Sequence, residues 1–524
     1  MTPDAAPIPN QAPSTAGMTN KVVKGSLWTL AGQVAPLGVS LIATPFVIRM
    51  LGAEGYGVLI LVGLIPNYLG FADFGMGIAS TKFASEAYAA GDSEKEARTV
   101  RTAALIALIG SVPVAAAIFF FSNTAITAFN VPPELHSEAN LALKLASVTF
   151  VIGFLNNIFN TPQLTRLRMD LNTFVNSGFR MLGLLATPIV IYLGGGILGA
   201  VAVLLIVTLL TLAAHLYVSG KLLNQLFQFT VDRSLIRPML KFGGALLIAL
   251  IAAGLLMHVE KIILTTMTSV ETLAHYSVAF TFSTMATMFA AAMMQALIPA
   301  FSQLLSPEKE QELGKLFTRA IRINVILMLP CLTALFIIAR PFFTTWAGEE
   351  FGRESAFPFQ ILLFGLFFSI VAYVPLSLLI ASGRTALMAK VYWCELVIYV
   401  VLVVICTWLL GAVGTAIAYS VRVIGDSFIV SFFSIRERTS SLSELKLILT
   451  NNKIGLLMII LTFAPAMAIS MTLDYFSPLL MIWLCLSMGI YALIIWKKFL
   501  EASEKIWTID LLKNGRISFF RILR

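Results

Sequence analysis

The chain lacks most of the residues on which soluble folds and enzymatic chemistry depend. Only 12% of its 524 residues are charged and 58% are hydrophobic, whereas soluble domains carry roughly 25% charged residues. Its four cysteines lie inside apolar stretches without paired spacing, and its four histidines are scattered, which argues against disulfides and a metal site. It has no Gly-Lys-Ser/Thr phosphate-binding loop. We therefore expect no enzyme activity, no metal and no cofactor.

Long apolar runs take the place of these missing features. About fourteen such runs of roughly twenty residues fill the chain from Ser26 to Trp496, and a bilayer core of about 30 Å needs helices of that length. The sequence therefore predicts an all-α, polytopic membrane bundle of about 14 transmembrane helices. The predicted spans are 26–48, 58–81, 102–121, 142–160, 175–194, 197–217, 242–262, 277–302, 323–346, 358–382, 388–409, 412–435, 454–473 and 477–496.

The positive charges are distributed unevenly between these spans. Most of the 36 Lys and Arg residues fall on alternate connections, and only Arg49, Lys261, Arg340 and Arg353 fall on the opposite side. The net charge of +9 is thus a positive-inside topology signal, so a nucleic-acid partner is not expected. Residues 1–20 lack the features of a signal peptide and are expected to form a disordered cytoplasmic leader. Both termini are expected in the cytoplasm.

Two short patterns recur along the chain at nearly one offset, which indicates an internal duplication. The turns near Tyr56 and Tyr276 are 220 residues apart, and the glycine turns at Gly196 and Gly411 are 215 apart. We expect two parallel six-helix repeats, 21–220 and 221–440, as in parallel-repeat transporters. The alternative is that short glycine turns recur by chance. Two extra transmembrane helices are expected in 441–500, followed by a basic cytoplasmic tail at 501–524.

Three motifs near the start of the chain resemble one known family. They are Lys24-Gly-Ser-Leu-Trp-Thr-Leu-Ala-Gly-Gln33, Ile48-Arg-Met-Leu-Gly-Ala-Glu-Gly-Tyr-Gly57 and Phe71-Ala-Asp73-Phe-Gly-Met-Gly77. Together they resemble oligosaccharide flippases (Wzx type) of the multidrug/oligosaccharidyl-lipid/polysaccharide exporter superfamily. The likeness covers residues 20–100, and the helix spacing extends it to 436. Glu260-Lys261 resembles the acid–base pair that members often carry near the end of helix seven.

The resemblance implies a function and a set of partners. A V-shaped bundle with a central cavity would move an undecaprenyl-diphosphate-linked oligosaccharide from the cytoplasmic to the outer leaflet of the bacterial inner membrane. The pathway would be the biosynthesis of O-antigen, capsule or exopolysaccharide, with membrane lipids, a proton or sodium gradient and a polysaccharide polymerase as partners. A related peptidoglycan-precursor flippase lines its cavity with several arginines. The first half of this chain has no comparable set, which argues against that substrate.

Charged residues at membrane depth are candidates for function, because each costs about 2.5–3.5 kcal/mol on insertion scales. Asp73, Glu395, Arg422 and Asp426 fall between the midplane and the cytoplasmic third. Arg422 is a candidate for binding a diphosphate through its planar donor fork, or else it neutralises Asp426 or Glu395. Asp73 is a candidate proton carrier, or else a buried acid hydrogen-bonded in the glycine-rich turn of helix two.

Further candidates lie near the helix ends. Arg49 and Lys261 mark the outer ends of helices one and seven, where they would meet the diphosphate or, as we favour, anchor the helices at lipid headgroups. The amides that could bind sugar hydroxyls or, as we favour, join helices are Asn156, Asn157, Asn160, Gln33 and Gln295.

Two other functions compete with a flippase. A cation-coupled multidrug or metabolite antiporter of the same superfamily would share the fold and the buried acids. A membrane glycosyltransferase or polymerase would need a sizeable outer catalytic loop, and outer segments such as 347–357 are too small.

Overall fold

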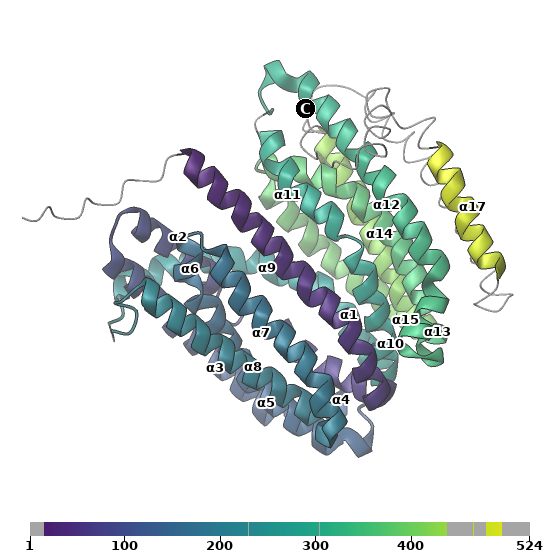
Figure 1. The fold of residues 1–524 in the computed structure, drawn as a ribbon, viewed down its shortest axis with the longest axis horizontal. Helices are drawn as coiled ribbons and strands as arrows, with labels where there is room; N and C mark the ends of the chain where they lie inside the picture. Colours follow the sequence, from purple (N-terminus) through teal and green to yellow (C-terminus); the bar gives the residue numbers. More distant parts are fainter. Residues whose placement is uncertain (1–14, 229, 303, 437–464, 466–477, 495–524) are drawn as a thin grey trace, which may run out of the picture. The chain divides into compact units, whose positions relative to one another are not determined.

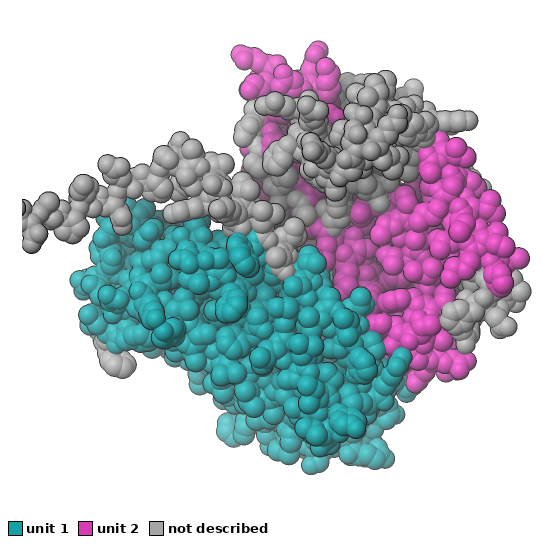
Figure 2. Space-filling model, in the orientation of Figure 1, with its two compact units in different colours: residues 1–258, 268–274 teal, residues 259–267, 275–524 magenta. Residues whose placement is uncertain are grey.

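The computed structural model describes residues 15–228, 230–302, 304–436, 465 and 478–494. Every regular element among these residues is a helix, which confirms the all-α membrane bundle (Figure 1). Seven of the described helical stretches are long and apolar enough to cross a membrane. The chain forms two compact units, residues 1–258 with 268–274 (unit 1) and residues 259–267 with 275–524 (unit 2), coloured separately in Figure 2.

Unit 1 is a bundle built around the long helices of the first half. Its elements are α1 (Thr15–Tyr68), α2 (Met76–Ala89), α3 (Ser93–Phe120), α4 (Ser122–Ala128), η1 (Pro133–Leu135), α5 (His136–Phe159), α6 (Thr161–Thr165), α7 (Met169–Val190), η2 (Ile191–Gly195), α8 (Gly196–Leu222) and the first part of α9 (Arg233–Met267). Helix α1 packs on α7, α5 packs on α3 and α8, and α2 packs on α3. Buried Val, Ile, Leu and Ala side chains fill the interfaces of α5 with α3 and α8 and of α2 with α3.

Unit 2 contains the remaining described helices. They are the end of α9, most of α10 (Val270–Met285), α11 (Met288–Ser302), η3 (Pro307–Lys309), α12 (Glu310–Ala347), α13 (Glu349–Glu354), α14 (Ala356–Ala381), α15 (Thr385–Arg436) and α17 (Pro478–Ile494). Helix α14 is the central element of this unit, because it packs on α11, α12 and α15. The α17 helix packs on α12 and corresponds to the predicted span at 477–496.

The two glycine turns named by the sequence share one backbone conformation. Gly196 has φ/ψ of 55°/−151° between α7 and α8, and Gly411 has 56°/−133° inside α15. Glycine alone adopts this region readily, because it has no Cβ. Gly411 thereby divides α15 into two helical segments, 385–410 and 412–436, as the sequence predicted for helices eleven and twelve.

Two spans that were predicted as continuous helices are broken. The span 58–81 is interrupted after Tyr68 and resumes at Met76, and the span 277–302 is interrupted between Met285 and Met288. In the first break Phe74 has a positive φ of 54°, as does Gly75 at 72°. The continuous-helix prediction is wrong at these places because hydropathy records apolar length and not local turn chemistry.

The first break is packed tightly by small residues. A Cβ at Gly243 of α9 would lie 2.2 Å from the Phe74 carbonyl oxygen, and a Cβ at Gly110 of α3 would lie 2.2 Å from the Ala72 carbonyl oxygen. Small residues allow this close approach of backbones between membrane helices. The broken turn of residues 69–75 is thus held between α3 and α9.

Other boundaries also differ from the sequence prediction. Helix α1 begins at Thr15, so the expected disordered leader 1–20 is helical over residues 15–20. The rest of the leader, the predicted helix at 454–473 apart from residue 465, and the tail at 501–524 lie outside the described residues.

Candidate functional site

A cluster of buried charges and aromatic rings lies inside unit 2. Glu260 and Lys261 come from the end of α9, Glu395 from the first segment of α15, and Arg422 and Asp426 from its second segment. Residues four apart share a helix face. The first segment of α15 therefore directs Glu395 and Tyr399 to one side, and the second segment directs Arg422 and Asp426 to one side. We call these five residues, with Tyr399, Tyr419 and Phe280, the charge cluster.

Arg422 is enclosed by aromatic rings and one carboxylate. Its Cζ lies 5.0 Å from the ring centroid of Tyr399 and 5.0 Å from that of Tyr419. Its Nη1 lies 3.9 Å from Glu395 Oε2, and the two side chains are only 12% and 10% exposed. This separation exceeds a hydrogen bond of about 3 Å. Arg422 and Glu395 are therefore a loose ion pair, stabilised in addition by cation–π contacts.

Glu260 and Lys261 occupy the other side of the cluster. Glu260 is fully buried and accepts a hydrogen bond of 3.2 Å from the Tyr399 hydroxyl through Oε2. Lys261 is 7% exposed, and its Nζ lies 4.0 Å over the Phe280 ring. The favoured prediction that Lys261 anchors helix seven at lipid headgroups is therefore wrong. Its position near a helix end did not reveal that its side chain faces the protein interior.

The carboxylates of the cluster are incompletely satisfied. Glu260 Oε1, both Glu395 carboxylate oxygens and Asp426 Oδ1 are buried without a hydrogen-bond partner among the described residues. Among the described residues, the ion pair of Arg422 is with Glu395. Three carboxylates face two cations, and a buried charge without full compensation is costly. Such a site can bind a proton or a small cation.

The other predicted residues, apart from Gln295, lie in unit 1. Asp73 accepts hydrogen bonds from the backbone N–H groups of Gly75 and Gly77 at 2.8 and 3.1 Å. Its carboxylate thus accepts hydrogen bonds from backbone N–H groups that have no helical acceptor at the start of α2. This arrangement matches the alternative hypothesis, in which Asp73 is an acid hydrogen-bonded in the glycine-rich turn. Asn156 is buried and its Nδ2 donates to the Thr208 carbonyl, which is the helix-joining role.

The remaining candidate amides and Arg49 differ in how far their side chains are exposed. Asn157, Gln33 and Arg49 are exposed on the protein, while Asn160 is partly buried. The side chain of Gln295 lies outside the described set. The structure therefore brings together Glu260, Lys261, Glu395, Arg422 and Asp426 in one unit, and places Asp73, Asn156, Asn157 and Arg49 in the other.

Sequence reasoning missed the aromatic part of the cluster and two ion pairs. The spacing of Tyr399 from Glu395 and of Tyr419 from Arg422 was the available signal. In unit 1, the buried Glu96 receives two hydrogen bonds from Arg166, at 2.5 and 3.1 Å, which hold α3 to the end of α6.

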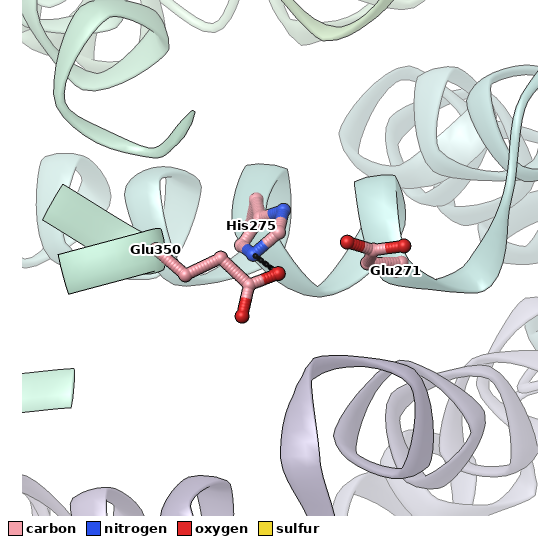
Figure 3. Close-up of side chains that lie close together, drawn as sticks. All are labelled: Glu271, His275 and Glu350. Carbon is pink, nitrogen blue, oxygen red and sulfur yellow. Dashed lines mark ion pairs between the residues drawn. The ribbon is translucent and has the colours of Figure 1, made fainter. Parts of the chain in front are cut away.

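In unit 2, Figure 3 shows His275 Nε2 directed at Glu350 Oε1, 3.6 Å away. Glu271, one turn earlier on α10, falls in the short segment that belongs to unit 1. Histidine and carboxylate are metal-ligand types, but this pair supplies two ligands where a structural zinc site uses four. We therefore interpret His275 and Glu350 as an ion pair that joins α10 to α13.

Comparisons with known proteins agree with this architecture. A family described as polysaccharide biosynthesis protein matches residues 22–305. A relative from Shigella flexneri named "Putative O-antigen transporter" is 21% identical over 425 residues, covering 79% of this chain and 98% of the relative. These similarities extend over most of the chain's helices.

Two solved structures share the fold. The lipid II flippase MurJ, in an inward closed conformation, is similar with a TM-score of 0.69 at 14% identity, over 91% of this chain and 99% of that chain. An inward-facing multidrug resistance MATE family transporter has a TM-score of 0.65 at 14% identity, over 77% of this chain and 96% of that chain. The names of these relatives describe transporters and flippases, and none describes an enzyme.

Proposed function

Since the chain belongs to the polysaccharide biosynthesis protein family, we propose that it is a flippase for a lipid-diphosphate-linked oligosaccharide. The substrate passes from the cytoplasmic to the outer leaflet of the bacterial inner membrane, where a polymerase uses it. The name of the Shigella flexneri relative and the fold shared with a lipid II flippase support this assignment. The specific lipid is an undecaprenyl diphosphate.

The physical problem is to carry a polar headgroup through hydrocarbon. Sugar hydroxyls lose their hydrogen bonds to water there, and the diphosphate charges lose their hydration. A helical bundle that opens alternately to either side provides a hydrated path while the prenyl tail remains in lipid. The repeated turn conformation at Gly196 and Gly411 supports two duplicated halves that exchange between such states.

The observation that carries the mechanism is the charge cluster. Three buried carboxylates face two buried cations, and four carboxylate oxygens have no hydrogen-bond partner among the described residues. We assign the cluster to ion coupling, with a proton or sodium ion bound in one state and released in the other. A membrane potential supplies about 2.3 kcal/mol per charge per 100 mV for this step. Arg422, enclosed by Tyr399, Tyr419 and Glu395, acts as the internal counter-ion more than as a diphosphate ligand.

A reconstituted assay tests the function directly. Proteoliposomes that contain the purified protein and a fluorescent undecaprenyl-diphosphate oligosaccharide should expose the label to an external quencher faster than empty liposomes. Glu260→Gln should abolish the acceleration by an ion gradient, while Glu354→Gln, on the exposed α13 helix, should not. In cells, deletion of the gene should trap the lipid-linked unit at the inner leaflet. Equal label exposure with and without the protein would reject the flippase.

An ion-coupled multidrug antiporter is the second candidate. The unsatisfied carboxylates of Glu395 and Asp426 favour it, because they could equally bind an organic cation. Energy-dependent efflux of organic cations from whole cells, lost in Asp426→Asn, would favour this function over the flippase.

A further inference from the structure

Tyr399 contacts two oppositely charged members of the charge cluster at once. Its hydroxyl donates to Glu260 Oε2 at 3.2 Å, and its ring centroid lies 5.0 Å from Arg422 Cζ. The side chain is 1% exposed. Glu395 lies one turn earlier on the same helix, and its Oε2 is 3.9 Å from Arg422 Nη1. One face of this α15 segment therefore holds Arg422 through a ring and a carboxylate.

The two contacts of Tyr399 depend on each other through the phenol. When Glu260 is ionised, the hydroxyl must donate to it, and this bond enriches the ring in electrons. An electron-rich ring attracts the guanidinium more strongly, since the attraction comes from the negative face of the ring. When Glu260 takes up a proton, the carboxylic acid can donate to the phenol oxygen instead. The ring then becomes poorer in electrons and its attraction for Arg422 decreases.

We propose that Tyr399 is a positioning residue that transmits the protonation state of Glu260 on α9 to Arg422 on the second segment of α15. The proposal rests on the ion-coupling role given to the cluster above. Tyr399 binds neither substrate nor ion. Its hydroxyl orients Glu260 Oε2, and its ring sets how firmly Arg422 is held near Glu395. Loss of this hold frees Arg422 to move when the coupling ion arrives.

The ionisable groups that interact with Tyr399, Glu260 or their neighbours Tyr419 and Glu395 come from four elements. On α9 and α10 they are Lys261 and Tyr276, on α14 Tyr373, and on α15 Glu395, Tyr419, Arg422 and Asp426. Among these, Glu395 and Asp426 are the acids whose titration could imitate that of Glu260. Glu395→Gln and Asp426→Asn are therefore needed as separate reference variants in any pH experiment.

A second buried tyrosine in the same unit provides a matched control. Tyr491 on α17 is also 1% exposed, and its hydroxyl accepts a 3.0 Å hydrogen bond from the neutral Thr333. Tyr399→Phe and Tyr491→Phe each remove one buried phenol oxygen. Tyr399→Phe removes a hydrogen bond to a carboxylate, whereas the described partner of Tyr491 is neutral, so general effects of losing a hydroxyl appear in both variants.

The test is the pH profile of transport in proteoliposomes. Tyr399→Phe removes a donor that favours ionised Glu260, so we expect the midpoint to move upward by about one pH unit, a tenfold change in proton affinity. Tyr491→Phe should keep the wild-type midpoint. In a Glu260→Gln background, Tyr399→Phe should cause no further change in the profile. A Tyr399→Phe profile that matches that of Tyr491→Phe, or a shift that persists with Gln at position 260, would overturn the proposal.

A spectroscopic measurement separates this proposal from the proposed function. In protein labelled with ¹³Cζ-tyrosine, the resonance lost in Tyr399→Phe identifies Tyr399. Its chemical shift should titrate with pH in the wild type and in the Glu395→Gln variant, and become constant in Glu260→Gln. This result is independent of flipping. If wild-type protein fails to flip lipid but the resonance behaves in this way, the function is wrong and the relay holds. If the titration of the resonance is the same with Glu or Gln at position 260 while lipid is flipped normally, the proposed function holds and the relay through Tyr399 is wrong.

Discussion

At the scale of single residues, the charge cluster consists of ions whose surroundings compensate them only in part. Arg422 lies 5.0 Å from two ring centroids and 3.9 Å from one carboxylate oxygen. Arg166, in contrast, makes short bidentate hydrogen bonds to Glu96. Short, charge-assisted pairs fix a structure, whereas loose ones can exchange partners. The contrast suggests that the Glu96–Arg166 pair holds unit 1 together, while Arg422 is held in a way that permits movement.

Arg422→Met should be strongly destabilising. The substitution leaves Glu395 buried without its cation, and breaking a buried pair in this way costs about 3 kcal/mol. Adding Glu395→Gln should recover much of the loss, since the uncompensated charge is then removed. Thermal or SDS-induced unfolding of the purified variants measures both effects. Arg353→Met, which removes an exposed ion pair with Glu354, should cause no measurable change. Equal losses in the single and double variants would contradict the argument.

The sequence revealed the charged residues of this site but not how they are held. An ion inside an apolar run is conspicuous, so Glu395, Arg422 and Asp426 could be selected without a structure. Phe280 could not, and Tyr399 was marked only by its four-residue spacing from Glu395, because aromatic residues are common throughout membrane helices. For Lys261, distance along the helix gave no information on which side its ammonium faces, and the favoured anchor role was therefore wrong.

At the scale of elements, the predicted spans that fall on described residues correspond to observed helices, and the errors concern where helices break. A twenty-residue apolar run reflects the thickness of the bilayer, so the spans were predictable. The break after Tyr68 depends on the Asp73 carboxylate, which accepts hydrogen bonds from two backbone N–H groups in place of helical carbonyls. It also depends on close backbone contacts of the turn with α3 and α9. Contacts between residues far apart in sequence are not contained in a hydropathy pattern.

Two adjacent glycines of α9 should respond differently to alanine. A Cβ at Gly243 would lie 2.2 Å from the Phe74 carbonyl oxygen, whereas a Cβ at Gly244 would meet nothing within 4 Å. We expect Gly243→Ala to destabilise the protein by about 2 kcal/mol through overpacking. Gly244→Ala should be neutral or stabilising by up to about 1 kcal/mol, because alanine favours helix. Unfolding midpoints in detergent would compare them, and equal midpoints would show that the close backbone contact is absent in solution.

The start of α9 should have a pH-dependent cap. Hydrogen bonds from the Ser234 hydroxyl and amide lower the pKa of the Asp232 carboxyl. A carboxylate with a lowered pKa stabilises the folded state above the usual value of 3.8, and this contribution is lost as the pH falls through the folded pKa. Hydrogen exchange of the amides at 233–236 should therefore accelerate only at strongly acidic pH. Ser234→Ala should move that acceleration to higher pH, and Asp232→Ala should remove it. An unchanged midpoint in Ser234→Ala would contradict the assignment.

At the scale of the whole molecule, charge and repetition are the two sequence patterns on which the predicted architecture depends. Basic residues on alternate connections predict the orientation of the helices, because Lys and Arg are retained on the cytoplasmic side during insertion. The glycine turns at Gly196 and Gly411, which share one backbone conformation, support the predicted duplication. Within unit 2, buried charges of α9 and α15 lie together in the charge cluster.

The orientation of the helices leads to a labelling prediction for two exposed residues. Lys95 lies at the start of α3 on a side rich in basic residues, and Arg353 lies on α13 with a side chain that is 67% exposed. In a background in which the four native cysteines are replaced, Arg353→Cys should react with a membrane-impermeant maleimide in intact spheroplasts. Lys95→Cys should react only after the membrane is permeabilised, because the positive-inside pattern predicts that its connection faces the cytoplasm. Equal labelling of both in detergent controls for thiol reactivity. The reverse pattern would invert the topology and, with it, the direction of transport proposed for the lipid-linked oligosaccharide.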